Sequence, residues 1–170
     1  QVIAAYGYSA SLPILETDFP SVWLSPRSSY AVLKVKHGDN NEISLFTAPR
    51  AGMLSGDISW SRLCDESDQV TDFAVIGDKI YLVTGKQAPR FKLVELSLND
   101  PDMASSRDVV PAGELVIESV SVAADALYIS AKRDGIGMIM RWAPDVALEE
   151  LSPPRGGATY LSSIAPDIPG

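Results

Sequence analysis

A seven-residue pattern of strand-forming residues occurs three times along the chain. Its clearest copies are Asp78–Thr84 and Asp125–Ala131, which lie 47 positions apart from Asp78 to Asp125, and Ser29–Val35 is a looser copy. A second apolar run follows each copy after a turn, at Ile43–Phe46, Phe91–Leu96 and Met138–Trp142. Repeats of about 40 to 50 residues that contain only strands and turns are typical of β-propeller blades. Because one blade cannot bury both of its faces alone, we expect function to belong to a larger ring.

Strand signals extend through the whole chain and predict an all-β fold. Short β-branched and aromatic runs alternate with turns such as Gly77-Asp78 and Asp134-Gly135. Helical periodicity is weak, and only Val146–Leu151 would fit a short turn of helix. We predict a partial β-propeller of three to four four-stranded antiparallel blades. The expected blades cover about 20–63, 70–110 and 115–151, with 1–19 and 157–170 as parts of flanking blades and Thr159–Leu161 opening a fourth.

Composition narrows the possible partners and cofactors. Fourteen Lys and Arg against 22 Asp and Glu give a net charge of −8, and basic blocks are missing, so we expect no nucleic acid partner. The single cysteine, Cys64, excludes an internal disulfide and a cysteine-based zinc site, and we expect no metal or cofactor. The uncharged stretch Val2–Leu15 is interrupted by Gly7 and Pro13, so it predicts neither a signal peptide nor a membrane span.

Two properties of the whole protein stay open at this point. The lack of disulfides fits the cytoplasm and also many periplasmic proteins, so the compartment is not decided. The chain opens at Gln1 rather than Met and begins within a strand pattern, which indicates a piece of a longer protein.

Several short motifs occur in a characteristic order between Phe19 and Trp142, about three quarters of the chain. They are Phe19–Val22, Ser25–Tyr30, Trp60–Leu63, Val70–Phe73, Asp78–Thr84, Ala88–Val94 and Val109–Pro111. In order and spacing they make the sequence resemble the propeller domain of the prolyl oligopeptidase family of serine peptidases.

The resemblance implies a parent protein with two parts. One part would be an α/β-hydrolase domain with a Ser-Asp-His triad, and the other a seven-bladed propeller that covers the active site. The propeller would restrict access to short peptides, which are cleaved after proline. This chain would hold three to four blades and none of the hydrolase domain, so its partners would be that domain and short peptides.

The chain itself offers no convincing catalytic residue. Gly7-Tyr8-Ser9-Ala10-Ser11 comes nearest to a nucleophile elbow, but Ser11 stands where the second glycine is needed. The only possible base, His37, lies in a polar turn and is interpreted as a solvated turn residue. We therefore expect Ser9 to be an ordinary loop serine and the chain alone to hydrolyse nothing.

The resemblance points to one substrate-facing hairpin, which contains Lys36 and Asp39. The corresponding hairpin of prolyl oligopeptidases reaches toward the active-site cavity. Lys36 takes the place of an arginine there, and Asp39 that of a cysteine, both of which help to line the substrate site. Lysine lacks the planar fork with which arginine holds a peptide carbonyl at two points.

The remaining polar and aromatic candidates are interpreted as structural. The acidic run Asp65–Asp68 has no glycine turn of the kind a calcium loop needs, so we expect a solvated loop. Cys64 and the three tryptophans (Trp23, Trp60 and Trp142) are expected to pack as apolar residues.

Two further hypotheses concern how the chain meets other molecules. The rival function is a free-standing β-propeller or β-sandwich binding module with no enzymatic activity. The isolated chain is also expected to self-associate through the exposed faces of its end blades. Those faces are predicted to carry Val22, Leu24, Leu33 and Val35 at one end, and Ile129, Ile139 and Met140 at the other.

Overall fold

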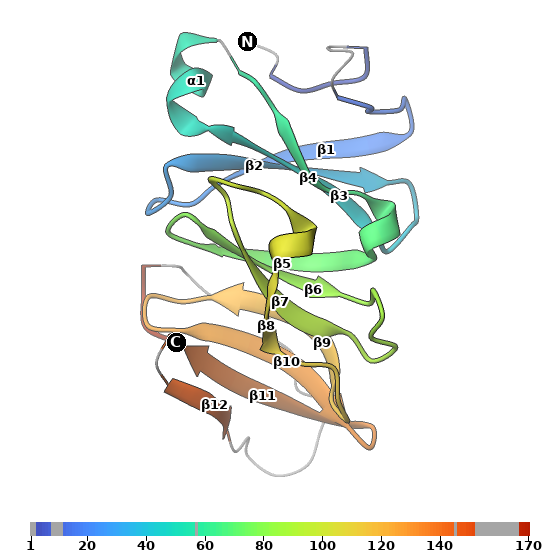
Figure 1. Cartoon of the computed structure of the whole chain (residues 1–170), viewed down its shortest axis with the longest axis vertical. Helices are drawn as coiled ribbons and strands as arrows, with labels where there is room; N and C mark the ends of the chain where they lie inside the picture. The colour runs from blue at the N-terminus through green and yellow to red at the C-terminus, as the bar shows by residue number, and fades with distance from the viewer. Residues whose placement is uncertain (1–2, 8–11, 57, 145, 152–166) are drawn as a thin grey trace. The chain divides into compact units, whose positions relative to one another are not determined.

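The computed structural model describes residues 3–7, 12–56, 58–144, 146–151 and 167–170 (Figure 1). Within these ranges the strands form three four-stranded antiparallel sheets, each with its four strands in sequence order. The predicted all-β class and partial propeller are therefore confirmed. Ser9 and Thr159–Leu161, for which we made predictions, lie outside the described residues.

The elements follow one another in a repeating order. The first sheet contains β1 (Asp18–Leu24), β2 (Tyr30–His37), β3 (Ile43–Pro49) and β4 (Ser61–Cys64), with the helix α1 (Arg50–Ser55) between β3 and β4. After the 3-10 turn η1 (Glu66–Asp68), the second contains β5 (Val70–Ile76), β6 (Lys79–Thr84), β7 (Lys92–Ser97) and, after η2 (Met103–Ser105), β8 (Arg107–Val110). The third contains β9 (Val116–Val122), β10 (Leu127–Arg133), β11 (Ile136–Ala143) and β12 (Val146–Leu151).

The chain divides into two compact units, and the second sheet contributes residues to both. One unit spans 1–70, 75–80 and 96–106 and includes the first sheet, while the other spans 71–74, 81–95 and 107–170 and includes the third. In the part of the chain that is described, no helix is long and apolar enough to cross a membrane.

A β-bulge recurs at the same place in each of the three described sheets. The pairing of the third strand with the fourth shifts register after Leu45, after Leu93 and after Arg141, and these residues are 48 positions apart. A bulge bends the strand and increases its local twist, so a bulge that recurs at a fixed spacing places the same local distortion between the third and fourth strands of each sheet. The repeat seen in the sequence is thus also a repeat of backbone geometry.

Tight turns fix the register of the strand pairs. Asp134 and Gly135 have φ angles of 52° and 80°, which places both in the left-handed region that a two-residue hairpin requires. Arg133 pairs with Ile136 across this turn. Glycine adopts such a conformation without strain and aspartate tolerates it, so this dipeptide sets the pairing of β10 with β11.

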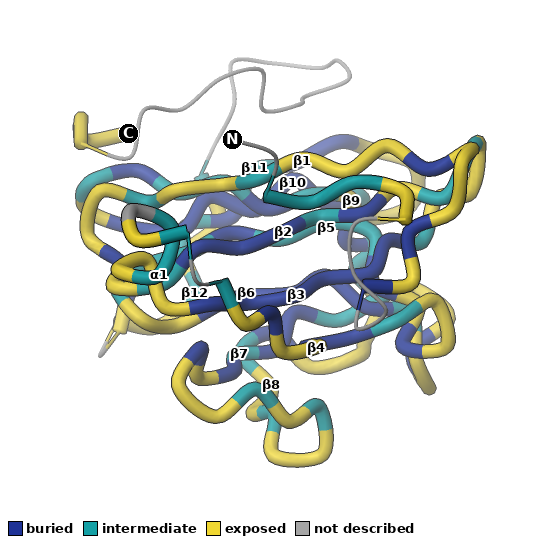
Figure 2. Tube along the Cα trace, turned by 90° about the horizontal axis from the view of Figure 1, so that it is seen from above, coloured by how far each residue is buried: buried dark blue, intermediate teal, exposed yellow. Residues whose placement is uncertain are grey.

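The first sheet has an apolar face that is covered by chain segments from outside the sheet. Leu33, Val35 and Phe46 on this face form a buried cluster with Leu12 and Ile14 of the preceding segment. Trp60 also belongs to the cluster, and its indole N–H donates to the Ile3 carbonyl at 3.1 Å. In Figure 2 the buried positions run along the strands and the exposed positions gather at the turns.

The prediction that the end faces are exposed is wrong for four of the seven residues named for them, and the cover on the first sheet accounts for Leu33 and Val35. Leu33, Val35, Ile129 and Met140 are all buried. Moreover, Ile139 does not share a face with Met140, because adjacent residues of a strand point to opposite sides of the sheet. Self-association of the isolated chain stays a prediction, and the apolar residues exposed for it on β1 are Phe19, Trp23 and Leu24.

The local structure agrees with the predictions at one place and differs at two. Val146–Leu151, the one segment that would fit a turn of helix, is the strand β12 and follows the predicted all-β pattern. The six-residue helix α1 was not predicted, since a run this short has almost no periodicity to detect. Trp23 is 56% exposed, whereas Trp60 is buried as expected.

A matched pair of isoleucines on neighbouring strands tests where the core of the third sheet lies. Ile129 is 1% exposed and Ile136 is 66% exposed. We expect Ile129→Ala to lower the free energy of unfolding by about 2–5 kcal/mol, since it leaves a cavity. Ile136→Ala should change it by less than about 0.5 kcal/mol. Urea unfolding followed by circular dichroism measures both, and equal effects would contradict the assigned burial.

Candidate functional site

The hairpin between β2 and β3 presents the two residues that the sequence singled out. Lys36 is exposed near the end of β2, where it lies between Phe19 and Ile43 in the strand pairing. Asp39 is exposed in the turn itself. The turn is closed by a hydrogen bond from the Asn40 N–H to the His37 carbonyl at 3.0 Å, and Gly38 supplies the positive φ of 53°. Both side chains are therefore available to a ligand at this hairpin.

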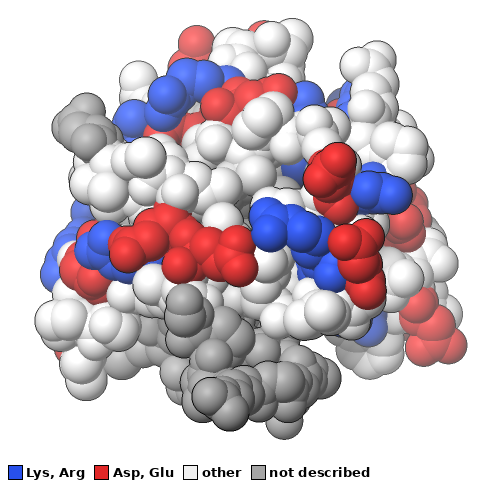
Figure 3. Space-filling view, turned by 90° about the horizontal axis from the view of Figure 1, so that it is seen from below, with Lys and Arg blue, Asp and Glu red and all other residues white. Residues whose placement is uncertain are grey.

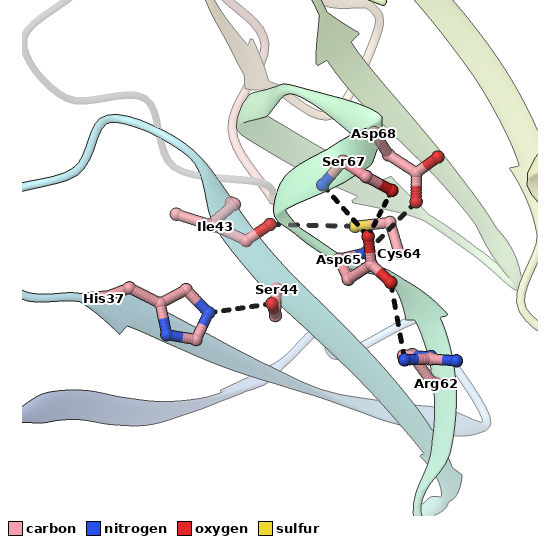
Figure 4. A network of polar contacts seen from close by, with 8 residues as sticks. All are labelled: His37, Ile43, Ser44, Arg62, Cys64, Asp65, Ser67 and Asp68. Atoms are coloured by element: carbon pink, nitrogen blue, oxygen red, sulfur yellow. Dashed lines mark hydrogen bonds and ion pairs between the residues drawn. The ribbon is translucent and has the colours of Figure 1, made fainter. Parts of the chain in front are cut away.

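His37 is largely shielded from solvent at the base of this hairpin, so its interpretation as a solvated turn residue is wrong. It is the last residue of β2, and its side chain is 14% exposed. Its Nδ1 lies 3.1 Å from Asp18 Oδ1, and its Nε2 lies 2.8 Å from Ser44 Oγ. The second of these contacts is drawn in Figure 4. The imidazole thus joins β1, β2 and β3 at one end of the sheet.

Asp18 ties the segment before β1 to the same network. The Leu15 N–H donates to Asp18 Oδ2 at 2.8 Å, and the Asp18 N–H donates to the Leu15 carbonyl at 3.2 Å. The Asp18 side chain is only 1% exposed, so its carboxylate depends on these donors for the hydrogen bonds that water would supply outside the protein.

The order serine, histidine, aspartate repeats the hydrogen-bond order of a catalytic triad, yet Ser44 is in the wrong place for catalysis. A nucleophilic serine must be open to a carbonyl carbon, as it is on a strained turn. Ser44 is 7% exposed and lies within β3, where its backbone pairs with Val35. This geometry makes the network a structural support for the hairpin rather than a site of acyl transfer.

The far side of the hairpin contacts the acidic run that follows β4. Asn40 donates from Nδ2 to Glu66 Oε1 at 2.9 Å. Asp65 accepts from the Ser67 N–H at 3.0 Å, and Asp68 accepts from the Asp65 N–H at 3.1 Å, which together form a capping box on η1. Figure 4 shows these carboxylates turned toward their own backbone and toward Arg62.

The acidic run is therefore only partly the solvated loop that we expected. Asp68 is buried, and its carboxylate is occupied by the turn it caps. Among the described residues, no group of three or more His, Cys, Asp and Glu side chains is arranged to hold a metal ion.

Cys64 and Tyr81 have raised pKa values, so both side chains stay protonated at neutral pH. Burial raises the pKa of the Cys64 thiol to about 12, so the thiol stays protonated and unreactive at neutral pH. Cys64 packs inside the sheet as expected. Burial together with the neighbouring Glu95 also raises the pKa of Tyr81, whose ring lies 5.5 Å from that of Trp142.

Comparison with known families decides what kind of protein carries this hairpin. A sequence model described as the prolyl oligopeptidase N-terminal beta-propeller domain matches residues 21–146. The chain belongs to the prolyl oligopeptidase family. The match covers the three sheets from β1 into β12.

Solved structures with the same fold include prolyl oligopeptidases and prolyl endopeptidases. Prolyl oligopeptidase B from Galerina marginata, in its apo form, aligns with a TM-score of 0.66 at 21% identity over 84% of this chain and 20% of that one. The same enzyme as a mutant bound to a 35mer hydrolysis and macrocyclization substrate aligns with a TM-score of 0.63 at 22% identity. That alignment covers 81% of this chain and 20% of the enzyme. A structure from a study of two prolyl endopeptidases aligns with a TM-score of 0.60 at 21% identity. That alignment covers 74% of this chain and 18% of the other.

The chain spans about a fifth of the length of these relatives. At such identities the likeness establishes the fold alone. No curated protein sequence gives a significant match.

The sequence predicted that Lys36 and Asp39 lie on a hairpin, but it did not predict the hydrogen-bond network below them. Asp18 was placed outside the first blade, and Ser44 was counted only as part of an apolar run. The signal that could have found them is strand register, because Asp18 pairs with His37 and Ser44 lies on the same face of the sheet. That register is fixed only once β1 is known to begin at Asp18.

Removing the buried carboxylate should destabilise the first sheet. Asp18→Ala removes the buried acceptor of the Leu15 N–H and of the His37 side chain, and we expect a loss of about 1–3 kcal/mol in the free energy of unfolding. Asp39→Ala is the matched control, since it removes an exposed carboxylate from the same hairpin. Urea denaturation measures the free energy of unfolding of both variants. Equal values would show that the network does not contribute to stability.

Proposed function

We propose that the chain is the substrate-gating propeller portion of a prolyl oligopeptidase-like serine endopeptidase that cleaves short peptides after proline. The observation that carries the proposal is the family match over residues 21–146, on a chain whose sheets repeat with a common bulge. The nucleophile, the base and the oxyanion hole would be supplied by an α/β-hydrolase domain outside this chain.

The hairpin of Lys36 and Asp39 would be the part of this portion that meets the peptide. Its support comes from two sides, with Asp18 and Ser44 holding His37 at the base and Glu66 holding Asn40 near the tip. A hairpin supported in this way loses little conformational freedom when a peptide binds, which favours recognition. The ammonium of Lys36 could donate to peptide carbonyls, and the carboxylate of Asp39 could accept from peptide N–H groups.

A length series of substrates tests the gating role in the complete protein. Prolyl peptides of increasing length should be cleaved with a kcat/KM that falls steeply once the peptide is too bulky to enter. A prolyl bond in an unfolded protein chain should be resistant. Equal kcat/KM values for short peptides and unfolded chains would refute gating. Binding of peptides without any hydrolysis would instead favour the free-standing binding module.

Substitutions in the hairpin test its contact with substrate. In the complete protein, Lys36→Ala and Asp39→Ala should each raise KM by about 3- to 10-fold with kcat nearly unchanged, because the contact would act equally in the bound substrate and the transition state. Asp100→Ala, at an exposed turn after β7, is the control and should leave KM unchanged. If both hairpin variants kept the parent kinetics, the hairpin would be a plain turn.

A further inference from the structure

The last four residues of the chain lie against the turn between β9 and β10. The Ala124 N–H donates to the Ile168 carbonyl at 3.0 Å, and the Gly170 N–H donates to Asp125 Oδ1 at 3.0 Å. Pro169 stands between the two bonded residues and has no N–H of its own. Both bonds therefore come from the main-chain groups on either side of the proline, as in the recognition of an extended peptide.

The carboxylate that receives the Gly170 N–H is held in place by other groups. Arg141 donates to Asp125 Oδ2 from Nη2 at 2.9 Å and from Nε at 3.2 Å, and the Tyr128 hydroxyl donates to the same oxygen at 3.1 Å. The Gly170 N–H and Arg141 together lower the pKa of Asp125 to about 2, so the acceptor stays charged at any ordinary pH. Asp125 is a fixed acceptor with one oxygen left for the incoming backbone.

The contact also selects for glycine and covers apolar surface. A Cβ atom added to Gly170 would clash with the ring of Tyr128. That ring is buried in a small cluster with Ala123, Ala126 and Ala143, against which Ile139 and Leu151 also pack. The position of Gly170 against the Tyr128 ring therefore leaves no room for a larger side chain.

The repeat-equivalent aspartate of the second sheet makes the same kind of contact. Asp78 Oδ1 accepts the Ser29 N–H at 2.7 Å and the Ser28 hydroxyl at 3.1 Å. Asp78 and Asp125 occupy the same position in their repeats, in the turn that leads into the second strand of each sheet. In both places the carboxylate fastens the main chain of a segment that is distant in sequence.

We propose that the β9–β10 turn is a docking site for an extended backbone segment that presents a carbonyl, a proline and a glycine in succession, and that residues 167–170 are its occupant. Asp125 is the anchor, Arg141 and Tyr128 position its carboxylate, and Tyr128 restricts the last residue to glycine. The inference is independent of the proposed peptidase function. It concerns how the chain fastens its own segment onto the third sheet.

Amide dynamics in the ¹⁵N-labelled full chain test the proposal. In the wild type, the heteronuclear NOE of the Ile168 and Gly170 amides should match that of strand amides such as Ile129. In Asp125→Ala both should fall to zero or below. Asp108→Ala, which removes an exposed aspartate bonded to Lys92 in the same unit, should leave them unchanged.

A second variant keeps the test valid if Asp125→Ala fails to fold. Gly170→Val adds the clash with the ring of Tyr128 but leaves every residue of the sheet and Asp125 unchanged, and it should release Ile168 while the strand amides keep their values. A low NOE for Ile168 and Gly170 in the wild type would overturn the proposal. Rigid Ile168 amides in folded Asp125→Ala or in Gly170→Val would overturn it as well.

Discussion

The apolar faces of the described sheets must be shielded from water by other parts of the protein. The segments that provide this cover determine the other contacts of the structure. A strand alternates its side chains between two faces, so a four-stranded sheet rich in Leu, Ile and Val carries apolar surface on both. Burying one such side chain stabilises the fold by about 1.5–3 kcal/mol, and leaving several exposed would remove much of a domain's stability. On the first sheet, Leu12, Ile14 and Trp60 provide this cover from outside the sheet.

The same cover explains why a buried ionisable cluster lies next to the candidate site. Leu12 and Ile14 can lie on the sheet only if the chain turns back into β1, and Asp18 fixes that turn through Leu15. The carboxylate that does this must then be paired, and His37 pairs it while also bonding Ser44. The resulting network joins β1, β2 and β3 at the base of the Lys36 and Asp39 hairpin. The segment that covers the sheet face therefore also helps to fix the position of the hairpin that would meet a peptide.

How far the sequence could predict this structure differs between local and long-range features. The repeat, the strand runs and the Asp134-Gly135 hairpin depend on nearest neighbours, so they could be read in advance. The exposure of Trp23 depends on which neighbour lies alongside, and no local pattern encodes that. The contacts of Asp18 with His37 and of Asp125 with Gly170 join residues 19 and 45 positions apart, so they needed the fold itself.

We propose above all that this chain shapes access to a reaction whose chemistry would be carried out elsewhere in the same protein. Labelling of the complete protein with a serine-reactive fluorophosphonate, followed by mapping of the modified peptide, tests it most directly. The account predicts stoichiometric labelling of one serine outside residues 1–170 and none within them. Labelling of Ser44 or Ser9 would contradict the claim, and so would a complete protein that takes up no label at all.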